Sequence, residues 1–271
     1  MWKFWWGGIN LRKIISFWDE ILYNKIMIDY KLIAKTIKES KYAVAFTGAG
    51  ISVESGVPPF RGPDGLWEKH GSQFAEISYF TRHPKESWQS LKKVFYEPID
   101  NVKPNKAHIV LANLEKAGIM HSVITQNIDN LHQEAGSKIV YELHGTAKYA
   151  VCMKCKNKYK INKEILSMNP PACEKCSSVL KPAFVFFGEQ LPSFDFQSSI
   201  DDANKSDLFI IIGTGGEVMP AAQIPHLAKR SGAKIIEINP EPSSFTNSIV
   251  DIYVKEKSGI AFGEIEKYLD I

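Results

Sequence analysis

The sequence predicts an α/β fold in which helices cover both faces of a doubly wound parallel sheet. Two observations support this prediction. Short apolar runs alternate with helical patterns along most of the chain from Lys31 onward, and this alternation is typical of parallel sheets. The first apolar run also leads into a turn with two close glycines, Gly48 and Gly50, where a backbone can approach a phosphate closely.

The candidate strands are short and apolar, and helical patterns separate them, which indicates a Rossmann-like sheet. We expect strands at residues 42–47, 122–125, 139–142, 184–187, 208–212, 234–238 and 251–254. Helical patterns lie near residues 31–40, 84–96, 105–117, 197–205, 219–231 and 259–269.

Two stretches interrupt the alternation and predict a second, smaller domain. Residues 58–104 contain no convincing core strand, and residues 149–181 are basic and contain every cysteine. We therefore divide the chain into an extension, a Rossmann-like domain and a small inserted domain. The ranges are 1–28 for the extension, 29–57, 118–147 and 183–271 for the large domain, and 58–117 and 148–182 for the small one.

Composition excludes some functions. The chain has 271 residues, of which 44% are hydrophobic and 23% charged, as in ordinary globular proteins. The net charge of +3 gives no strong case for a nucleic-acid partner. No run of about 18 apolar residues predicts a membrane span, and we expect a cytoplasmic protein. The sequence indicates no oligomeric state.

The N-terminal stretch is amphipathic. Four of the six tryptophans fall within residues 1–27, and apolar residues recur there at helical spacing. A secretion signal is not expected, because a continuous apolar segment and a small-residue cleavage site are missing. Three interpretations stay open: a helix packed on the domain, a surface helix that binds a partner, or an upstream extension with Met27 as the natural start.

The four cysteines form one pattern, in which two C-x-x-C pairs are separated by 17 residues: Cys152, Cys155, Cys173 and Cys176. Four thiolates at this spacing suit tetrahedral Zn²⁺, and because they fill every position the zinc would be structural. Disulfides are less favoured, since no secretion signal accompanies the cysteines. A zinc ribbon that binds nucleic acid would show the same pattern.

Polar groups follow three of the candidate strands. Residues 52–56 after the glycine turn offer free backbone N–H groups, and Arg61 follows two prolines that stiffen the chain. Gln126, Asn127 and Asp129 follow residues 122–125, and His144 follows residues 139–142. Parallel sheets bind ligands at these strand ends, and amides suit a carboxamide or ribose hydroxyls. Alternatively, the glycines form only a tight turn, Arg61 is a surface residue, Asp129 caps a helix and His144 is structural.

From about Tyr42 to about Lys267 the chain resembles the sirtuins, the NAD-dependent protein deacylases. The matching blocks are GAGIS, SGVPPFRG, GLW, TQNIDNLHQEAG, ELHGT, the two C-x-x-C pairs, KPAFVFFGE, GTGGEVMPA and INPEP. The resemblance implies a protein-lysine deacetylase that transfers the acetyl group of acetyl-lysine to ADP-ribose and releases nicotinamide. It also implies that NAD is consumed as a co-substrate and that one structural Zn²⁺ is bound.

The resemblance implies roles for individual residues. His144 resembles the general base that deprotonates a ribose hydroxyl, and Asn127 and Asp129 resemble the catalytic residues that orient the ribose and the carboxamide. Further residues implied to bind the cofactor are Gly48, Ala49, Gly50, Ser52, Gly56, Phe60, Arg61, Trp67, Gln126, Ile128, Gly213, Thr214, Gly215, Asn239, Pro240, Glu241 and Ser258. The substrate backbone would lie as an added strand between Val185, Phe186, Phe187 and Gly188 on one side and Gly216, Glu217 and Val218 on the other.

The chain departs from the family pattern at a few positions. Pro59 stands where an acidic residue usually precedes Phe-Arg-Gly, and Gly215 stands where the family usually has serine. Sirtuins that prefer succinyl or malonyl groups have a Tyr-x-x-Arg pair, whose positions fall near Lys92 and Phe95. Without that arginine to pair a carboxylate, acetyl or an apolar acyl group is favoured.

Other functions remain as alternatives. Mono-ADP-ribosyl transfer or NAD hydrolysis would use the same scaffold, and so would deacylation of longer acyl chains. A zinc-ribbon module that binds NAD or nucleic acid without turnover is the non-enzymatic alternative. His144 beside Asn127 and Asp129 argues against it, because a binding module needs no base.

Overall fold

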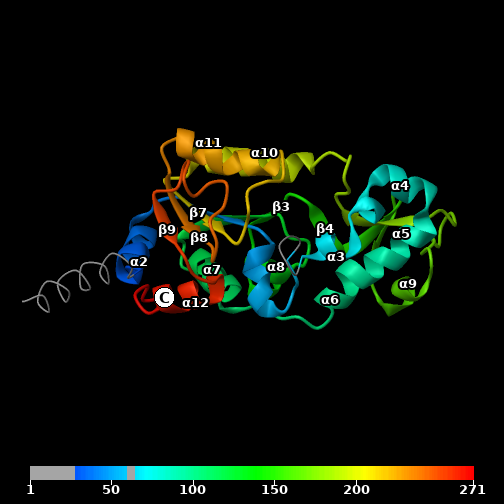
Figure 1. Ribbon diagram of the computed structural model, residues 1–271, viewed down its shortest axis with the longest axis horizontal. Helices are drawn as coiled ribbons and strands as arrows, with labels where there is room; N and C mark the ends of the chain where they lie inside the picture. Colours follow the sequence, from blue (N-terminus) through cyan, green and yellow to red (C-terminus); the bar gives the residue numbers. More distant parts are fainter. Residues whose placement is uncertain (1–27, 60–64) are drawn as a thin grey trace, which may run out of the picture.

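The computed structural model describes residues 28–59 and 65–271, which form a large parallel sheet with a smaller module at one end (Figure 1). The large sheet has the order β3-β2-β1-β7-β8-β9, and every neighbouring pair is parallel. The doubly wound sheet predicted from the sequence is therefore confirmed. Its strands are β1 (Ala43–Thr47), β2 (Met120–Thr125), β3 (Val140–Glu142), β7 (Leu208–Ile212), β8 (Lys234–Ile238) and β9 (Ile252–Val254).

Helices cover both faces of this sheet because its central strands are apolar on both sides. In β1, Ala43 and Ala45 face one layer of helices, and Val44 and Phe46 face the other, as the two-residue period of a strand requires. Figure 1 shows α10 and α11 above the sheet and α7 and α12 below it. The first layer contains α2 (Tyr30–Glu39), α7 (Lys106–Lys116) and α12 (Ser258–Glu266), and the second contains α10 (Ser193–Lys205) and α11 (Ile224–Arg230), preceded by η4 (Ala221–Gln223).

The smaller module combines short helices with a three-stranded antiparallel sheet of order β5-β4-β6. Trp88 ties the two parts together, because its buried indole N–H donates to the carbonyl of Leu180 at 2.7 Å. The strands are β4 (Gly145–Cys152), β5 (Lys158–Lys160) and β6 (Leu180–Phe184). The helices are α3 (Leu66–His70), η2 (Gln73–Ala75), α4 (Ile77–Arg82), α5 (Pro84–Leu91), the π-helix η3 (Lys92–Tyr96), α6 (Glu97–Ile99) and α9 (Lys163–Ser167).

Two expectations are corrected by the packing. The strand expected at residues 184–187 instead spans Leu180–Phe184 and belongs to the antiparallel sheet. Helix α7, which the sequence grouped with the small domain in the range 58–117, packs on the large sheet. Its apolar side chains share one core with α12, namely Ala107, Val110, Leu111 and Leu114. The other domain boundaries stay a prediction.

The N-terminal extension predicted for residues 1–28 lies outside the described residues, apart from its last position. The cofactor-loop residues Phe60 and Arg61 also lie outside them. Within the described part of the chain, no helix could cross a lipid bilayer.

The sheet reverses its direction of winding between β1 and β7. From β1 the chain order runs outward through β2 and β3, and from β7 it runs the opposite way through β8 and β9. Thr47 at the end of β1 pairs with Ile212 at the end of β7. Ligands of open α/β sheets bind at the carboxyl ends of strands at such a switch point, and this is where most of the predicted site residues lie.

Candidate active site

Two glycine turns touch at the switch point. The N–H of Gly48 donates to the carbonyl of Ile212 at 3.0 Å, and the N–H of Gly50 donates to the carbonyl of Gly213 at 2.8 Å. A Cβ atom at Gly50 would lie 2.6 Å from the Cα of Gly213, and Gly213 itself has a φ of +59°. The two backbones can approach this closely only because side chains are absent. The turn after β1 continues as the 3₁₀-helix η1 (Ala49–Ser55), which ends at Gly56.

The loop after β2 places an amide and a carboxyl group beside these turns. The Asn127 side-chain nitrogen donates to the carbonyl of Gly48 at 3.1 Å and to Ser52 Oγ at 3.2 Å. Ser52 in turn donates to Asp129 Oδ2 at 2.7 Å. Asp129 also accepts from the N–H of Leu131 at 3.0 Å, at the start of α8 (Leu131–Ala135). The N-cap position of α8 is Asn130, so Asp129 contacts the start of this helix without being its cap residue, and its role in the site stays a prediction.

Two features of this cluster point to a ligand. Asn127 Oδ1 is buried and has no hydrogen-bond partner among the described residues, and an unpaired buried acceptor costs about 1–3 kcal/mol. Burial raises the pKa of Asp129, although the bonds from Leu131 and Ser52 oppose the shift. A ligand that donates a hydrogen bond to Asn127 would satisfy the unpaired oxygen.

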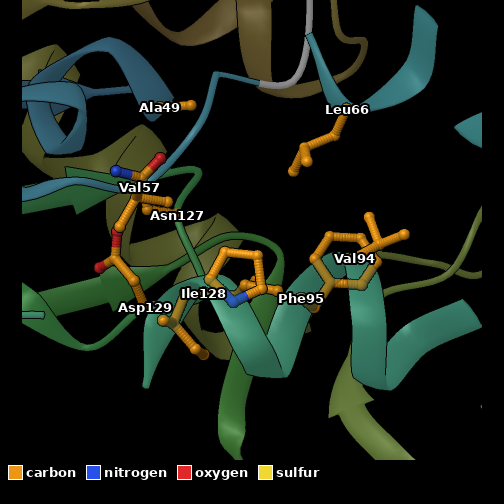
Figure 2. Close-up of a pocket in the computed structure, with 10 residues that line it drawn as sticks. Ala49, Val57, Leu66, Val94, Phe95, Asn127, Ile128 and Asp129 are labelled. Carbon is orange, nitrogen blue, oxygen red and sulfur yellow. The ribbon is translucent and has the colours of Figure 1, made fainter. Parts of the chain in front are cut away.

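Asn127 and Asp129 line a partly open pocket with a cavity volume of about 20 Å³. Figure 2 shows Asn127 and Asp129 on one side of it and Leu66, Val94 and Phe95 on the other. Ala49, Val57, Pro98, Ile99 and Ile128 complete the lining. The resemblance named Ala49, Ile128 and the neighbourhood of Phe95, and its matching blocks contain Val57 and Leu66. The apolar helical pattern near residues 84–96 was the signal for Val94, and no sequence signal indicated Pro98 and Ile99. The lining combines apolar side chains with the amide of Asn127 and the carboxyl group of Asp129, and this chemistry matches an apolar ring that carries an amide.

His144 lies in the turn between β3 and β4, half-buried and held in one orientation. Its Nδ1 lies 2.9 Å from the carbonyl of Gln126, and because a carbonyl only accepts, Nδ1 carries the proton. The lone pair is then on Nε2. Burial lowers the pKa of His144, and the bond to Gln126 only partly opposes it. The ring is therefore neutral near pH 7 and able to accept a proton.

A second group of predicted cofactor residues is connected through Thr214. Gln126 Nε2 donates to Thr214 Oγ1 at 3.0 Å, and Asn239 Nδ2 donates to the carbonyl of Thr214 at 3.1 Å. These three side chains join the ends of β2, β7 and β8. Gly215 is exposed, with open space where a Cβ would lie.

The outermost predicted cofactor residues have other contacts. Pro240 and Glu241 are exposed after β8, and Glu241 lies 3.7 Å from the Lys255 amine. Ser258 is buried at the start of α12, with its hydroxyl 3.4 Å from the Glu54 carboxylate. The side chain of Trp67 lies outside the described residues.

The predicted substrate segment at residues 185–188 is already firmly held. The N–H of Val185 donates to the carbonyl of His144 at 2.8 Å. Both polar backbone groups of Phe187 bond to the chain at residues 75–77, at 2.9 and 3.0 Å. The side chain of Phe186 is buried in the core of the small module. The backbone groups of Val185 and Phe187 that are already bonded cannot pair with an added strand. A substrate strand could therefore pair with only the rest of the segment, including Gly188.

The opposite substrate segment begins at Gly216, where a Cβ would lie 2.4 Å from the ring of Phe245. The Ser244 hydroxyl donates to the carbonyl of Gly216 at 2.9 Å. Glu217 is exposed and Val218 is half-buried, so this segment presents side chains as well as backbone to solvent.

A lysine that the sequence did not single out braces the segment 185–188. Lys181 is largely buried, and its amine lies 2.9 Å from Glu189 Oε2 and donates to the carbonyl of Phe184 at 2.8 Å. Glu189 Oε2 also accepts from the N–H of Phe186 at 2.8 Å. Burial lowers the pKa of Lys181, while Glu189 opposes the shift. The partners are up to eight residues apart, and no short motif indicates the pairing.

The four cysteines converge as predicted. Their Sγ atoms all lie within 4.8 Å of one another, and Cys152 and Cys176 approach to 3.4 Å and Cys155 and Cys173 to 3.6 Å. These separations are too long for disulfides. They are near the ~3.8 Å expected between ligands of a tetrahedral ion with Zn–S bonds of about 2.3 Å. The residues fit a structural zinc ion.

Comparisons with known proteins agree with this geometry. The model of the Sir2 family matches residues 48–220. An NAD-dependent protein deacylase from Pyrococcus furiosus is 45% identical over 233 residues, covering 84% of this chain and 92% of its own length. NAD-dependent protein deacylase 2 from Pyrobaculum aerophilum is 44% identical over 228 residues, covering 84% and 90%.

Solved structures show the same relationship. A Sir2 protein with a p53 peptide and NAD⁺ superposes with a TM-score of 0.81 at 36% identity, covering 89% of this chain and 98% of that one. A Sir2 homologue variant with ADP-ribose gives 0.82 at 37% identity, covering 90% and 99%. With the family model spanning most of the chain and relatives at this identity over most of both lengths, the chain belongs to the Sir2 family, the sirtuins.

Proposed function

We propose that this protein removes acetyl groups from lysine side chains of other proteins and consumes NAD in doing so. The acetyl group is transferred to ADP-ribose, and nicotinamide is released. The observation that carries the proposal is the unpaired, buried Oδ1 of Asn127 at the edge of an apolar pocket. A nicotinamide ring matches the apolar wall, and its carboxamide supplies the missing donor.

The polar residues at the site have different roles in the reaction. Asn127 and Asp129, joined through Ser52, orient the nicotinamide ribose and its carboxamide. The carbonyl oxygen of acetyl-lysine then attacks the anomeric carbon as the bond to nicotinamide breaks. His144, with its Nε2 unprotonated, accepts a proton from a ribose hydroxyl, which is general-base catalysis.

The adenosine half of NAD lies along the other strand ends. The contact between the glycine turns places the start of η1 at the switch point, where open α/β sheets typically bind a diphosphate. Gln126, Thr214 and Asn239 form a connected hydrogen-bonded edge beside it that suits ribose hydroxyls. Phe60 and Arg61, which the resemblance assigns to the cofactor, lie outside the described residues.

The peptide substrate lies between residues 185–188 and residues 216–218. The ion pair of Lys181 and Glu189 fixes the first segment, so its backbone is preorganised for pairing. Lys92, which the sequence places near the acyl group, donates to the carbonyl of Met168 at 2.6 Å, in keeping with an uncharged acyl group.

The zinc ion would be held by Cys152, Cys155, Cys173 and Cys176, where it would supply stability to the small module rather than chemistry. We place the protein in the cytoplasm, because four thiols arranged for a metal suit a reducing compartment. Cell fractionation tests this placement. Because the acyl group is transferred to ADP-ribose, the enzyme would be classed as a transferase.

One assay tests the function. The protein is incubated with NAD and an acetyl-lysine peptide, and the products are separated by mass spectrometry. We expect nicotinamide, deacetylated peptide and acetylated ADP-ribose in equal amounts. Nicotinamide with free ADP-ribose and intact peptide would instead indicate an NAD hydrolase, and ADP-ribose attached to protein would indicate a transferase. No products at all would refute an enzymatic role.

A further inference from the structure

His132 is buried directly behind the active-site loop. It belongs to α8, is 1% exposed and does not line the pocket. Its Nε2 lies 2.9 Å from Thr47 Oγ1. A histidine in this position cannot accept a proton from a ligand in the pocket, yet burying an imidazole is costly unless its hydrogen bonds are used.

A chain of hydrogen bonds connects this ring to the active site. Thr47 and Thr125 pair with each other at the ends of β1 and β2, and the Thr47 hydroxyl donates to Thr125 Oγ1 at 2.8 Å. Thr125 Oγ1 then accepts from the backbone N–H of Asn127 at 3.0 Å. Two hydroxyl groups therefore separate the imidazole from the backbone of the residue that carries the unpaired amide oxygen.

A second buried histidine lies beside His132. His108 is fully buried, and its ring centroid lies 4.8 Å from that of His132. His108 Nδ1 accepts from the N–H of Asn105 at 3.3 Å, so the proton of the neutral ring is on Nε2. That atom and His132 Nδ1 both lack partners within the described residues. The hydrogen bond between His132 Nε2 and Thr47 Oγ1 therefore decides which nitrogen of His132 carries the proton.

The direction of the hydrogen bonds through the two threonines assigns this proton to His132 Nε2. A threonine hydroxyl has one proton, and Thr47 donates it to Thr125, so Thr47 must accept from His132. Burial lowers the pKa of His108 to about 4 and that of His132 well below its usual value. Both rings are neutral, and each hydrogen bond from His132 through Thr47 and Thr125 to Asn127 has a defined donor.

We propose that His132 is a positioning residue for NAD cleavage: as a neutral imidazole protonated on Nε2, it holds the hydroxyls of Thr47 and Thr125 and thereby the backbone of Asn127. This rests on the proposed role of Asn127 in binding nicotinamide. With its backbone N–H fixed from behind and its side-chain nitrogen bonded to Gly48 and Ser52, Asn127 keeps its Oδ1 in one place.

The first test measures the histidine tautomers of the wild-type protein and needs no activity assay. Long-range ¹⁵N–¹H NMR at neutral pH distinguishes the two tautomers of each histidine. We expect Nε2–H for both His132 and His108. A proton on Nδ1 of His132, or a doubly protonated ring, would overturn the proposal, because Thr47 would then have to donate to the ring or the ring would be charged.

The second test measures coupling along the chain. His132→Phe and Thr125→Val keep shape but remove the polar link, and His132→Gln keeps a donor. We expect each of the first two to lower kcat for nicotinamide release about ten-fold, with the KM for the acetyl peptide unchanged. The double variant should resemble either single one, because both break the same chain. His132→Gln should recover most of the rate. His83→Gln, an exposed histidine, is the control and should match the wild type.

Amide hydrogen exchange tests the role of His132 independently of the proposed deacetylase function. The N–H of Asn127 should exchange slowly in the wild type and at least ten-fold faster in both the His132→Phe and the Thr125→Val variants, whether or not the protein deacetylates. A wild type without activity but with these exchange rates would refute only the proposed function. An additive loss of about a hundred-fold in the double variant, or unchanged exchange at Asn127, would refute the role of His132. If His132→Phe fails to fold, the Thr125→Val variant and the tautomers of the wild-type histidines still test the role of His132.

Discussion

Replacing Gly50 with alanine tests whether the contact between the two glycine turns positions the cofactor site. The new Cβ would lie 2.6 Å from Gly213 Cα and 2.7 Å from the Gly213 carbonyl oxygen. Ordinary contacts begin at 3.4 Å, so the turns would have to separate by about 0.8 Å. Both opposing atoms are backbone, and no side chain can rotate away to relieve the overlap.

The separation has a predictable effect on function. It would stretch the 2.8 Å bond between the Gly50 N–H and Gly213 beyond the length of a hydrogen bond. It would also move Thr214, which follows Gly213 and holds Gln126 and Asn239. A misplacement of about 1 Å costs on the order of 10² in rate. We therefore expect kcat/KM for NAD to fall about a hundred-fold, which corresponds to about 2.7 kcal/mol.

The assay is nicotinamide release at varied NAD with saturating acetyl peptide, with thermal unfolding measured in parallel. Gly263→Ala is the matched control, because the nearest atom to a Cβ built at Gly263 is Lys106 Cγ at 3.8 Å, an ordinary contact. Its kinetics should stay within about two-fold of the wild type. If Gly50→Ala kept near-native kcat/KM while folded, the close contact of the turns would not position the cofactor.

Three further predictions concern the zinc site, the acyl group and the base. Cys152→Ser with Cys155→Ser should release the metal and unfold the small module, since structural zinc supplies about 10 kcal/mol or more of folding free energy; a folded, fully active, metal-free variant in metal analysis and circular dichroism would contradict this. Acetyl peptide should be turned over faster than succinyl peptide at equal NAD, because Lys92, the nearest basic candidate, donates to the carbonyl of Met168 at 2.6 Å; equal or faster succinyl turnover would show another basic group in the site. His144→Ala should bind NAD within a few-fold but deacetylate at least 10² slower, as seen by calorimetry and single turnover. In the wild type, the base is active when neutral, so kcat/KM should rise with pH, and because burial lowers the pKa of His144 the midpoint should lie below the usual value of about 6.5. A variant that kept its rate or its inflection would exclude His144 as the base.

The large sheet and the position of the candidate active site at its strand ends could be predicted from the sequence for one physical reason. Parallel strands buried on both faces are continuous apolar runs, so β1, β2, β7 and β8 stand out. Because parallel strands all end at the same edge, polar residues after them, such as Gln126 and His144, must lie near one another. The spacing of the cysteines similarly constrained their geometry, and the four Sγ atoms converge as expected.

The elements that the sequence missed lack such a signal. Strand β4 alternates buried and exposed residues only partly, and β5 reads Lys-Tyr-Lys, because neither is covered on both faces. Helix α7 has an apolar face that would fit either module, and only the fold brings it to α12. The pocket wall depends on the π-helix η3, whose wider turn sets the positions of Val94 and Phe95, and propensity does not predict such a turn.

The position of His144 relates the two halves of the molecule to each other. β3 belongs to the large sheet and β4 to the small one, so the residue lies in the two-residue connection between them. Its ring is fixed from the cofactor side by the carbonyl of Gln126, and its own carbonyl is fixed from the substrate side by the N–H of Val185. Val185 opens the segment that Lys181 and Glu189 brace. A ring held in this way keeps its orientation only when both modules are in place, and we therefore expect that variants that unfold the zinc-binding module also displace His144.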